Sequence, residues 1–276
     1  MKANVLRGRV EALVGLVVLG TFLFPIYWMF AGSFRTLQDL FGFPPALIPN
    51  PIEFSHWERI LGDPAVIRYI ANSFVIASGT CVLTLVLAAP AAYALARLPI
   101  RGKSTVMLLS LGSLMFPAIM LATPLYVIFS RLGLTDTYAG LILADTSLAL
   151  PYAIILLRPA FLSVPNEITE AALIDGCSGF GAFRRVVLPL ARTGLATVAI
   201  FSFLWGWGDF VFALTLATDE TMRPVTTGLW AFVGPNDPDW GAIMAFATVA
   251  MLPPLVLFLL ARRHVVAGVA AGGLKG

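Results

Sequence analysis

Long apolar stretches, separated by short polar segments rich in proline and glycine, dominate this chain. Six of them are long enough for a helix that crosses a hydrocarbon core of about 30 Å. We place them at residues 12–34, 70–96, 104–130, 138–160, 190–217 and 241–261. Continuous apolar runs differ from the alternating strands of about ten residues in a membrane β-barrel. The pattern therefore predicts an all-α polytopic membrane protein with six transmembrane helices in a single domain, residues 1–276.

Three polar segments lie between or after the predicted spans. Residues 35–69 are rich in proline and turn residues and predict a folded surface segment. Residues 164–189 predict two short helices, with Asn166 capping the first, Gly176 ending it in the left-handed conformation and Ser178 capping the second. The residues alone support equally a docking element for another protein and an amphipathic loop on the membrane surface. Residues 262–276 form a glycine-rich tail, which either reaches a partner or ends freely.

Composition agrees with a membrane protein. Hydrophobic residues make up 59% of the chain and charged residues 12%, about half the charged share of soluble domains. The first apolar run follows three basic residues, as in a signal peptide, but it is longer than the usual h-region and lacks a clear cleavage site. We expect an uncleaved first span. Cys81 and Cys177 are interpreted as small apolar fillers without a disulfide.

Basic residues are distributed unevenly between the two sides of the predicted topology. Thirteen lie on the side of the two termini, and five lie on the other side: Arg35, Arg59, Arg68, Arg131 and Arg223. Cytoplasmic loops carry the excess of Lys and Arg. Both termini and residues 164–189 are therefore predicted to be cytoplasmic, and residues 35–69 extracytoplasmic.

Catalytic and nucleotide-binding motifs are missing from the sequence. It contains no HExxH, no G-x-S-x-G, no metal-binding Cys/His spacing and no P-loop, so we expect a non-enzyme that binds neither ATP nor metal. Two acidic residues fall inside predicted spans, where ionisable groups are expensive and often functional. Asp145 either lines a pathway or pairs with polar neighbours. Asp209, which follows Trp205, either faces a pathway or belongs to an aromatic packing cluster.

Residues 170–189 carry a family signature. "EAALIDG", nine further residues and "VVLP" resemble the E-A-A-x3-G-x9-I-x-L-P pattern of membrane subunits in ATP-binding-cassette importers, with Val186 in place of isoleucine. "ALIPNPIEFSHWERIL", "AAYALARLPIRGK", "GWGDFVFAL" and the terminal "GVAAGGLKG" extend the resemblance over nearly the whole chain. It is similar to the carbohydrate (maltose-transporter-type) branch, although Gly208 replaces that branch's asparagine.

The resemblance implies one half of a translocation pathway for a sugar. A second permease chain forms the other half, two ATPase subunits use ATP and Mg, and an extracytoplasmic solute-binding protein delivers the solute. Residues 217–240 are a candidate contact for that protein because they form a turn-rich outer loop with Trp230 and Trp240; alternatively, these tryptophans anchor the chain at the membrane interface. The permease chain binds no cofactor itself and lies in a bacterial-type inner membrane. The resemblance assigns coupling to the ATPase subunit to Glu170, Ala171, Ala172, Ile174, Asp175, Gly176, Leu188 and Pro189.

Other functions remain open at this stage. The solute is alternatively a polyol, a sugar phosphate or another non-sugar. An ion-coupled secondary transporter is disfavoured because no internal repeat is evident. A membrane enzyme is disfavoured because no catalytic constellation appears. Asp145, Trp205 and Asp209 stay candidates for the pathway.

Overall fold

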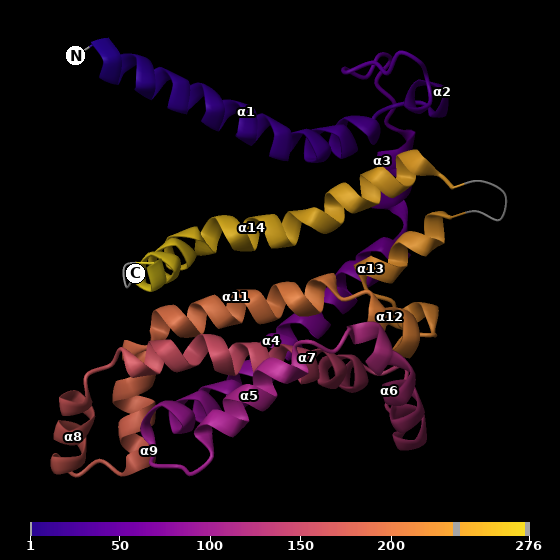
Figure 1. The fold of residues 1–276 in the computed structure, drawn as a ribbon. Coiled ribbons are helices and arrows are strands. Elements are labelled where there is room, and N and C mark those ends of the chain that lie inside the picture. The colour runs from indigo at the N-terminus through magenta and orange to yellow at the C-terminus, as the bar shows by residue number, and fades with distance from the viewer. Residues whose placement is uncertain (1, 234–237, 274–276) are drawn as a thin grey trace. The chain divides into compact units, whose positions relative to one another are not determined.

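The computed structural model describes the backbone of residues 2–233 and 238–273, and the side chains of residue 8 and residues 10–233 and 238–260. Within these residues the chain is helical, and its β-structure is one isolated bridge between Val233 and Pro238. The chain divides into two compact units (Figure 1), Met1–Val66 with Leu229–Leu252 and Ile67–Gly228 with Pro253–Gly276.

The helices of the first unit carry the N-terminal span and the segment predicted as folded surface structure. They are α1 (Lys2–Gly32), α2 (Leu37–Leu40), α3 (Ser55–Gly62), η3 (Leu229–Phe232) and the first part of α14 (Trp240–Gly273). Arg35 is fully buried here, with its guanidinium 4.4 Å from the centre of the Trp28 ring and a hydrogen bond of 3.0 Å to the Leu47 carbonyl. Arg59 forms an ion pair of 2.6 Å with Asp239.

The second unit contains most of the chain. Its helices are α4 (Pro64–Arg97), α5 (Lys103–Ser113), α6 (Ala118–Leu132), α7 (Tyr138–Leu162), α8 (Asn166–Ile174), α9 (Gly179–Ala182), η1 (Phe183–Val187), α10 (Leu188–Leu190), α11 (Arg192–Gly208), α12 (Val211–Leu216), η2 (Glu220–Met222) and α13 (Val225–Gly228). α4 begins three residues before the unit boundary.

The predicted membrane topology is confirmed in number and corrected in shape. Among the described residues, four helical stretches are long and apolar enough to cross a membrane, and two bent pairs bring the total to six if each pair is one span. The third predicted span is broken between α5 and α6, which meet at 97°. The long helix of the fifth predicted span, α11, ends at Gly208 and not near residue 217. The tail predicted at residues 262–276 lies outside the described side chains.

Small residues let the long helices of the second unit pack closely. A buried cluster from α4, α7, η1 and α11 contains Ala88, Ala89, Ala92, Ala153, Leu157, Phe161, Val164, Phe183, Val187, Ala191 and Val198. In a membrane, small residues at helix interfaces allow the backbones to approach and increase van der Waals contact. The same cluster joins η1 to the spanning helices, so the segment after α8 is anchored to the bundle.

At Gly194, α11 packs closely against α7. A Cβ at this position would lie 2.4 Å from the Cβ of Ala160, so Gly194→Ala requires the helices to separate. We expect this overpacking to destabilise the protein by about 1–3 kcal/mol, measured as a lower melting temperature in detergent. Gly208→Ala in the same helix is the matched control, because a Cβ there meets nothing within 4 Å. Equal melting temperatures for both variants would contradict this packing.

Candidate functional site

The first short helix of residues 164–189, α8, begins differently from the prediction. Pro165 occupies the N-cap position without a side-chain hydrogen bond, and Asn166 is the first helical residue. The predicted Asn166 cap is therefore wrong. The Asn166 side-chain oxygen instead accepts a hydrogen bond from the guanidinium of Arg97. The fixed φ of proline suits a helix start. Because Pro165 occupies the N-cap position, the side-chain amide of Asn166 is free to bind Arg97.

The end of α8 confirms the prediction for Gly176. Its φ of +87° is left-handed, a conformation that costs residues with a Cβ about 1–2 kcal/mol. The Gly176 N–H donates to the Leu173 carbonyl at 3.1 Å, and the Cys177 N–H donates to the Ala172 carbonyl at 3.0 Å. This pair of bonds is the Schellman motif, which satisfies the last carbonyls of a helix.

The second short element confirms the Ser178 cap. The Ser178 hydroxyl accepts a hydrogen bond of 3.1 Å from the Gly181 N–H. The helix then widens into a π-helical turn, η1, in which Phe183 and Val187 are buried. Phe180, three residues before Phe183, is 71% exposed. This element therefore presents Phe180 outward and holds to the bundle through Phe183 and Val187.

The residues assigned to coupling lie together, and most of them face outward. Ile174 is 87% exposed, and Glu170, Ala171, Asp175, Gly176 and Pro189 are also exposed, while Leu188 is half-buried. Ala172 is 8% exposed and packs within the chain, which corrects the expectation that both alanines admit a partner. An exposed surface of isoleucine, alanine and glutamate on a short, capped helix suits protein docking.

Arg97 connects this segment to the spanning helices, and no motif in the sequence indicated this role. Its Nε donates to the Phe161 carbonyl at 3.0 Å, and its Nη2 donates to the same carbonyl at 2.7 Å and also to the Val164 carbonyl. Together with the bond to Asn166, Arg97 connects the end of α4 with the end of α7 and the start of α8. Only its place in a basic loop was visible in the sequence, because its partners lie more than 60 residues away.

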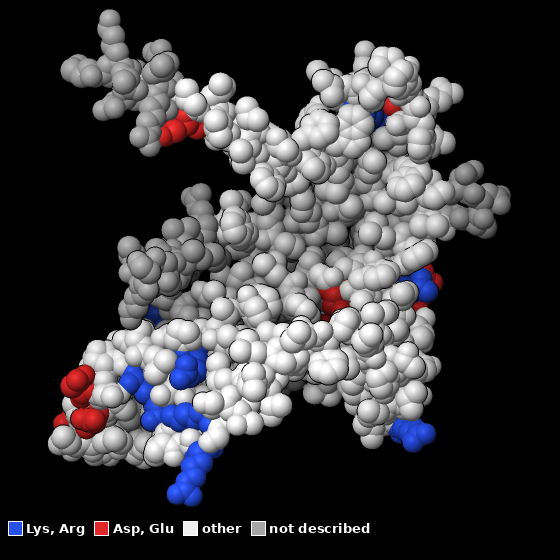
Figure 2. Space-filling model, viewed as in Figure 1, with Lys and Arg blue, Asp and Glu red and all other residues white. Residues whose placement is uncertain are grey.

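Charge is distributed unevenly on this end of the second unit. Lys and Arg side chains gather over the end that carries α5, α8 and α9, and acidic side chains lie at its edge (Figure 2). Glu167 and Glu170 belong to α8, and Arg184 and Arg185 to η1; all four are exposed. A partner that docks on this segment therefore meets carboxylates on α8 and guanidinium groups on η1.

Asp145 lies inside the helix bundle and not on an open surface. Its side chain is among the most buried of the second unit, with 1% of the residue exposed. Thr80 of α4 faces its carboxyl group, but neither Asp145 Oδ1 nor the Thr80 hydroxyl reaches hydrogen-bond geometry. The hydroxyls of Thr84, Thr146 and Ser202 are also buried without a partner. Asp145 therefore lies among buried polar side chains and not on an exposed surface, and its Oδ1 is not paired with any of them by a hydrogen bond.

Asp209 and Trp205 lie close in sequence and have different surroundings. Asp209 ends α11, and its carboxylate accepts hydrogen bonds from the N–H groups of Phe212 and Ala213, at 3.4 and 2.9 Å, at the start of α12. This is a helix cap, which favours the structural interpretation. Trp205 is 37% exposed and lies 5.8 Å from Phe201, centre to centre. Trp205 therefore remains the aromatic candidate for a pathway.

Metal ligands do not gather anywhere in the part of the chain that the structure describes. No group of three or more His, Cys, Asp or Glu side chains is placed to hold an ion there.

Comparisons with known proteins agree on one family. A family model described as "Binding-protein-dependent transport system inner membrane component" matches residues 84–271. A trehalose transport system permease protein of Mycobacterium tuberculosis is 36% identical over 98% of this chain and 98% of its own length. A trehalose/maltose transport system permease protein of Thermococcus litoralis is 31% identical over the full length of both chains.

A solved structure has the same fold. It is the crystal structure of a bacterial ABC transporter involved in the import of the acidic polysaccharide alginate. One of its chains superimposes with a TM-score of 0.81 at 23% identity, over 95% of this chain and 98% of that chain. At this identity the likeness is evidence for the fold alone.

Proposed function

Because the chain belongs to the family of binding-protein-dependent transport system inner membrane components, we propose that it forms half of the translocation pathway of an ATP-driven sugar importer. It is a multi-pass membrane permease subunit and not an enzyme. The sugar class is supported by relatives named for trehalose, maltose and diacetylchitobiose, each over more than nine-tenths of this chain. The proposed partners are a second permease chain, two ATPase subunits and a solute-binding protein.

The exposed surface of α8 carries the coupling part of the proposal. Ile174 and Ala171 face outward on a helix closed by the Schellman turn at Gly176, while Phe183 and Val187 of η1 attach the segment to the bundle. A docking helix that is anchored in this way transmits a partner's movement to α4, α7 and α11. The ATPase subunit then changes the equilibrium between two conformations of the permeases through the difference in its docking free energy. Such couplings are about 1–3 kcal/mol.

The remaining assignments follow from the charge bias and the positions of the residues. We propose that both termini and residues 164–189 face the cytoplasm, that residues 35–69 face outward, and that Trp205 lies near the pathway. Asp209 supports the start of α12 through its hydrogen bonds to the N–H groups of Phe212 and Ala213, and Asp145 lies buried inside the second unit. Residues 217–240 are proposed to contact the solute-binding protein.

Transport by the assembled complex tests the function. The chain is co-purified with the partner chains encoded near it and reconstituted into proteoliposomes loaded with ATP and Mg. We expect uptake of trehalose, maltose or diacetylchitobiose that requires both ATP and the solute-binding protein. Mannitol and glycerol 3-phosphate represent the polyol and sugar-phosphate alternatives. Uptake that persists without ATP and follows an ion gradient would overturn the importer assignment, and uptake of mannitol or glycerol 3-phosphate alone would overturn the sugar class.

A further inference from the structure

A buried polar layer lies between α4, α7 and α11 of the second unit, apart from the coupling segment. It consists of one carboxyl group and three hydroxyl groups: Asp145 of α7, Thr80 and Thr84 of α4, and Ser202 of α11. Each of these residues is at most 1% exposed. Asp145 Oδ1 and the three hydroxyls have no hydrogen-bond partner among the described residues. Since buried polar groups are nearly always hydrogen-bonded, these oxygens are available to a ligand.

The register of the helices places the four side chains at one level. Asp145 faces Thr80, and a Cβ on Gly206 of α11 would lie 3.1 Å from Thr80 Oγ1. The end of α4 and the start of α11 share one buried cluster, so these two helices run in opposite directions. Ser202, one turn before Gly206, therefore lies beside Thr84, one turn after Thr80. Three helices thus contribute oxygens to the same place.

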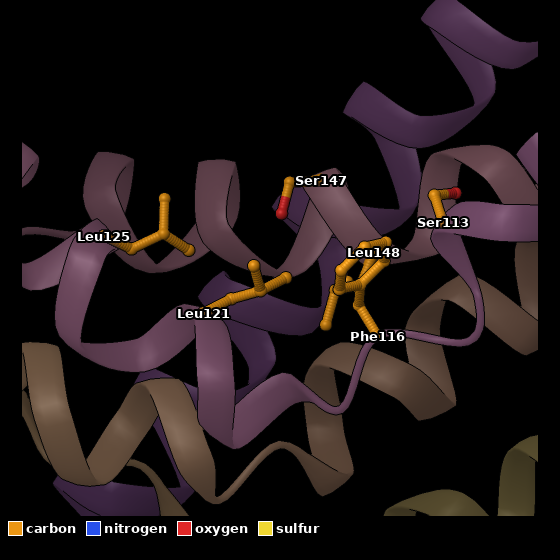
Figure 3. A pocket seen from close by; sticks show the side chains of 6 residues that line it. All are labelled: Ser113, Phe116, Leu121, Leu125, Ser147 and Leu148. Atoms are coloured by element: carbon orange, nitrogen blue, oxygen red, sulfur yellow. The ribbon is translucent and has the colours of Figure 1, made fainter. Parts of the chain in front are cut away.

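Other hydroxyls on these helices are satisfied within their own helix. The Ser147 hydroxyl donates to the Ala144 carbonyl at 2.6 Å, and the Thr197 hydroxyl donates to the Thr193 carbonyl at 3.0 Å. Ser147 lies about 200° around α7 from Asp145, where it is exposed and lines an open hollow beside α6 (Figure 3). The hydroxyls of the buried layer differ in having no such carbonyl, and their oxygen lone pairs can accept or coordinate.

The Asp145 carboxyl group has no basic partner among the described residues. α4 and α7 are long and apolar enough to cross a membrane, where an ionisable side chain is expensive. The basic residues of the three helices are ten or more positions from the layer, which is about 15 Å or more along a helix: Arg68, Arg97, Arg158 and Arg192. The nearby Asp209 has the same charge and is engaged at the start of α12. A buried charge must be paired or neutralised, so Asp145 holds a proton or a cation.

We infer that this polar layer binds a monovalent alkali cation, with Asp145 as the charged ligand and the three hydroxyl oxygens as neutral ligands. Hard cations take oxygen ligands of these kinds. A proton would neutralise the carboxylate but leave the hydroxyls without a partner, and water would satisfy the hydroxyls but leave the charge. One available carboxylate balances a single positive charge, which favours a monovalent ion. The ion would connect three helices of the bundle, and its binding does not depend on which solute is transported.

Thermal labelling of Cys81 tests the cation site. Cys81 is half-buried on α4 next to Thr80, so its reaction with a thiol-reactive dye reports the opening of this part of α4. The complete complex, with Cys177→Ala in the permease, is heated in nanodiscs in equal concentrations of NaCl, KCl or N-methylglucamine chloride. The permease is then separated from its partners by electrophoresis. We expect the labelling midpoint to be about 3–6 °C higher at ten times the Kd of Na⁺ or K⁺, because an ion that binds only the folded form stabilises it.

Three variants identify the ligands. Asp145→Asn keeps the shape of the side chain and removes its charge, and it is expected to abolish the difference between the salts. Ser202→Ala removes one neutral ligand and is expected to need about 5–10-fold more ion for the same shift. Ser147→Ala is the matched control, because Ser147 lies on the other face of α7 and its hydroxyl is bonded within the helix. It is expected to respond to the salts like the parent.

Each result decides the cation site. Equal midpoints of the parent in the three salts overturn it. In that case, a midpoint that rises on acidification in the parent but not in Asp145→Asn shows a bound proton, and no such rise shows water alone. A salt effect that persists in Asp145→Asn places the ion elsewhere and also overturns the site. If Asp145→Asn does not assemble, equal responses of Ser202→Ala and Ser147→Ala overturn it. No uptake is measured, so failure of the proposed function is seen separately.

Discussion

Replacing Gly176 with valine is expected to reduce ATP-dependent uptake by about 5–30-fold while the chain still enters the membrane. Gly176 has a φ of +87°, and a side chain in this conformation costs about 1–2 kcal/mol, which corresponds to a factor of about 5–30 in an equilibrium. The cost affects the turn that ends α8 and orients its exposed surface. A Cβ at this position meets nothing within 4 Å, so the effect arises from the backbone and not from a clash.

Two variants separate backbone strain from other causes. Gly176→Asn is expected to retain most of the uptake, because asparagine tolerates the left-handed conformation better than other residues do. Gly179→Ala tests the next glycine of the same segment, where an added Cβ also meets open space. Uptake, ATPase activity and the amount of co-purified ATPase subunit are measured for all three. Normal uptake and assembly in Gly176→Val would show that the shape of this turn does not matter for coupling.

Removing the side chain of Arg97 is expected to uncouple the permease from its ATPase partner. In Arg97→Ala the carbonyls of Phe161 and Val164 lose their guanidinium donor, and Asn166 loses its partner. Hydrogen bonds to charged groups contribute about 1.5–3 kcal/mol, so we expect α8 to lose its fixed position. The measurements are ATP-dependent uptake, expected to fall at least as far as in Gly176→Val, and recovery of the ATPase subunit with the permease.

The control for Arg97 removes the same charge from the same region. Arg101→Ala takes away an exposed basic residue a few positions further on, and we expect its uptake to be near normal. Arg97→Lys keeps the charge but not the planar fork that reaches several acceptors at once, so we expect an intermediate loss. If Arg97→Ala and Arg101→Ala behaved alike, net charge and not the bond network would explain the effect.

Local rules predicted the ends of the short helices with mixed success. Ser178 and Gly176 perform the predicted roles because an N-cap and a left-handed turn depend on a few neighbouring residues. Asn166 does not cap α8, because Pro165 occupies the N-cap position. The side-chain oxygen of Asn166 instead accepts a hydrogen bond from Arg97, which lies 69 residues away in the sequence. The same distance explains why Arg97 was missed. The break near Pro117 was visible as a proline, but the 97° bend and the pocket beside α7 were not.

The sequence by itself determined the class of protein and the family, and it predicted six spans and a coupling segment. Long apolar runs are excluded from water whatever their neighbours are, and the spacing from Glu170 to Pro189 is a property of the chain alone. Only the tertiary structure decided which residues face outward: Ala172 packs inward while Ile174 is exposed, and Asp145 is buried beside Thr80. It also brought Thr80, Asp145 and Ser202 together from three helices. Such choices depend on contacts between distant parts of the chain, which a linear pattern does not contain.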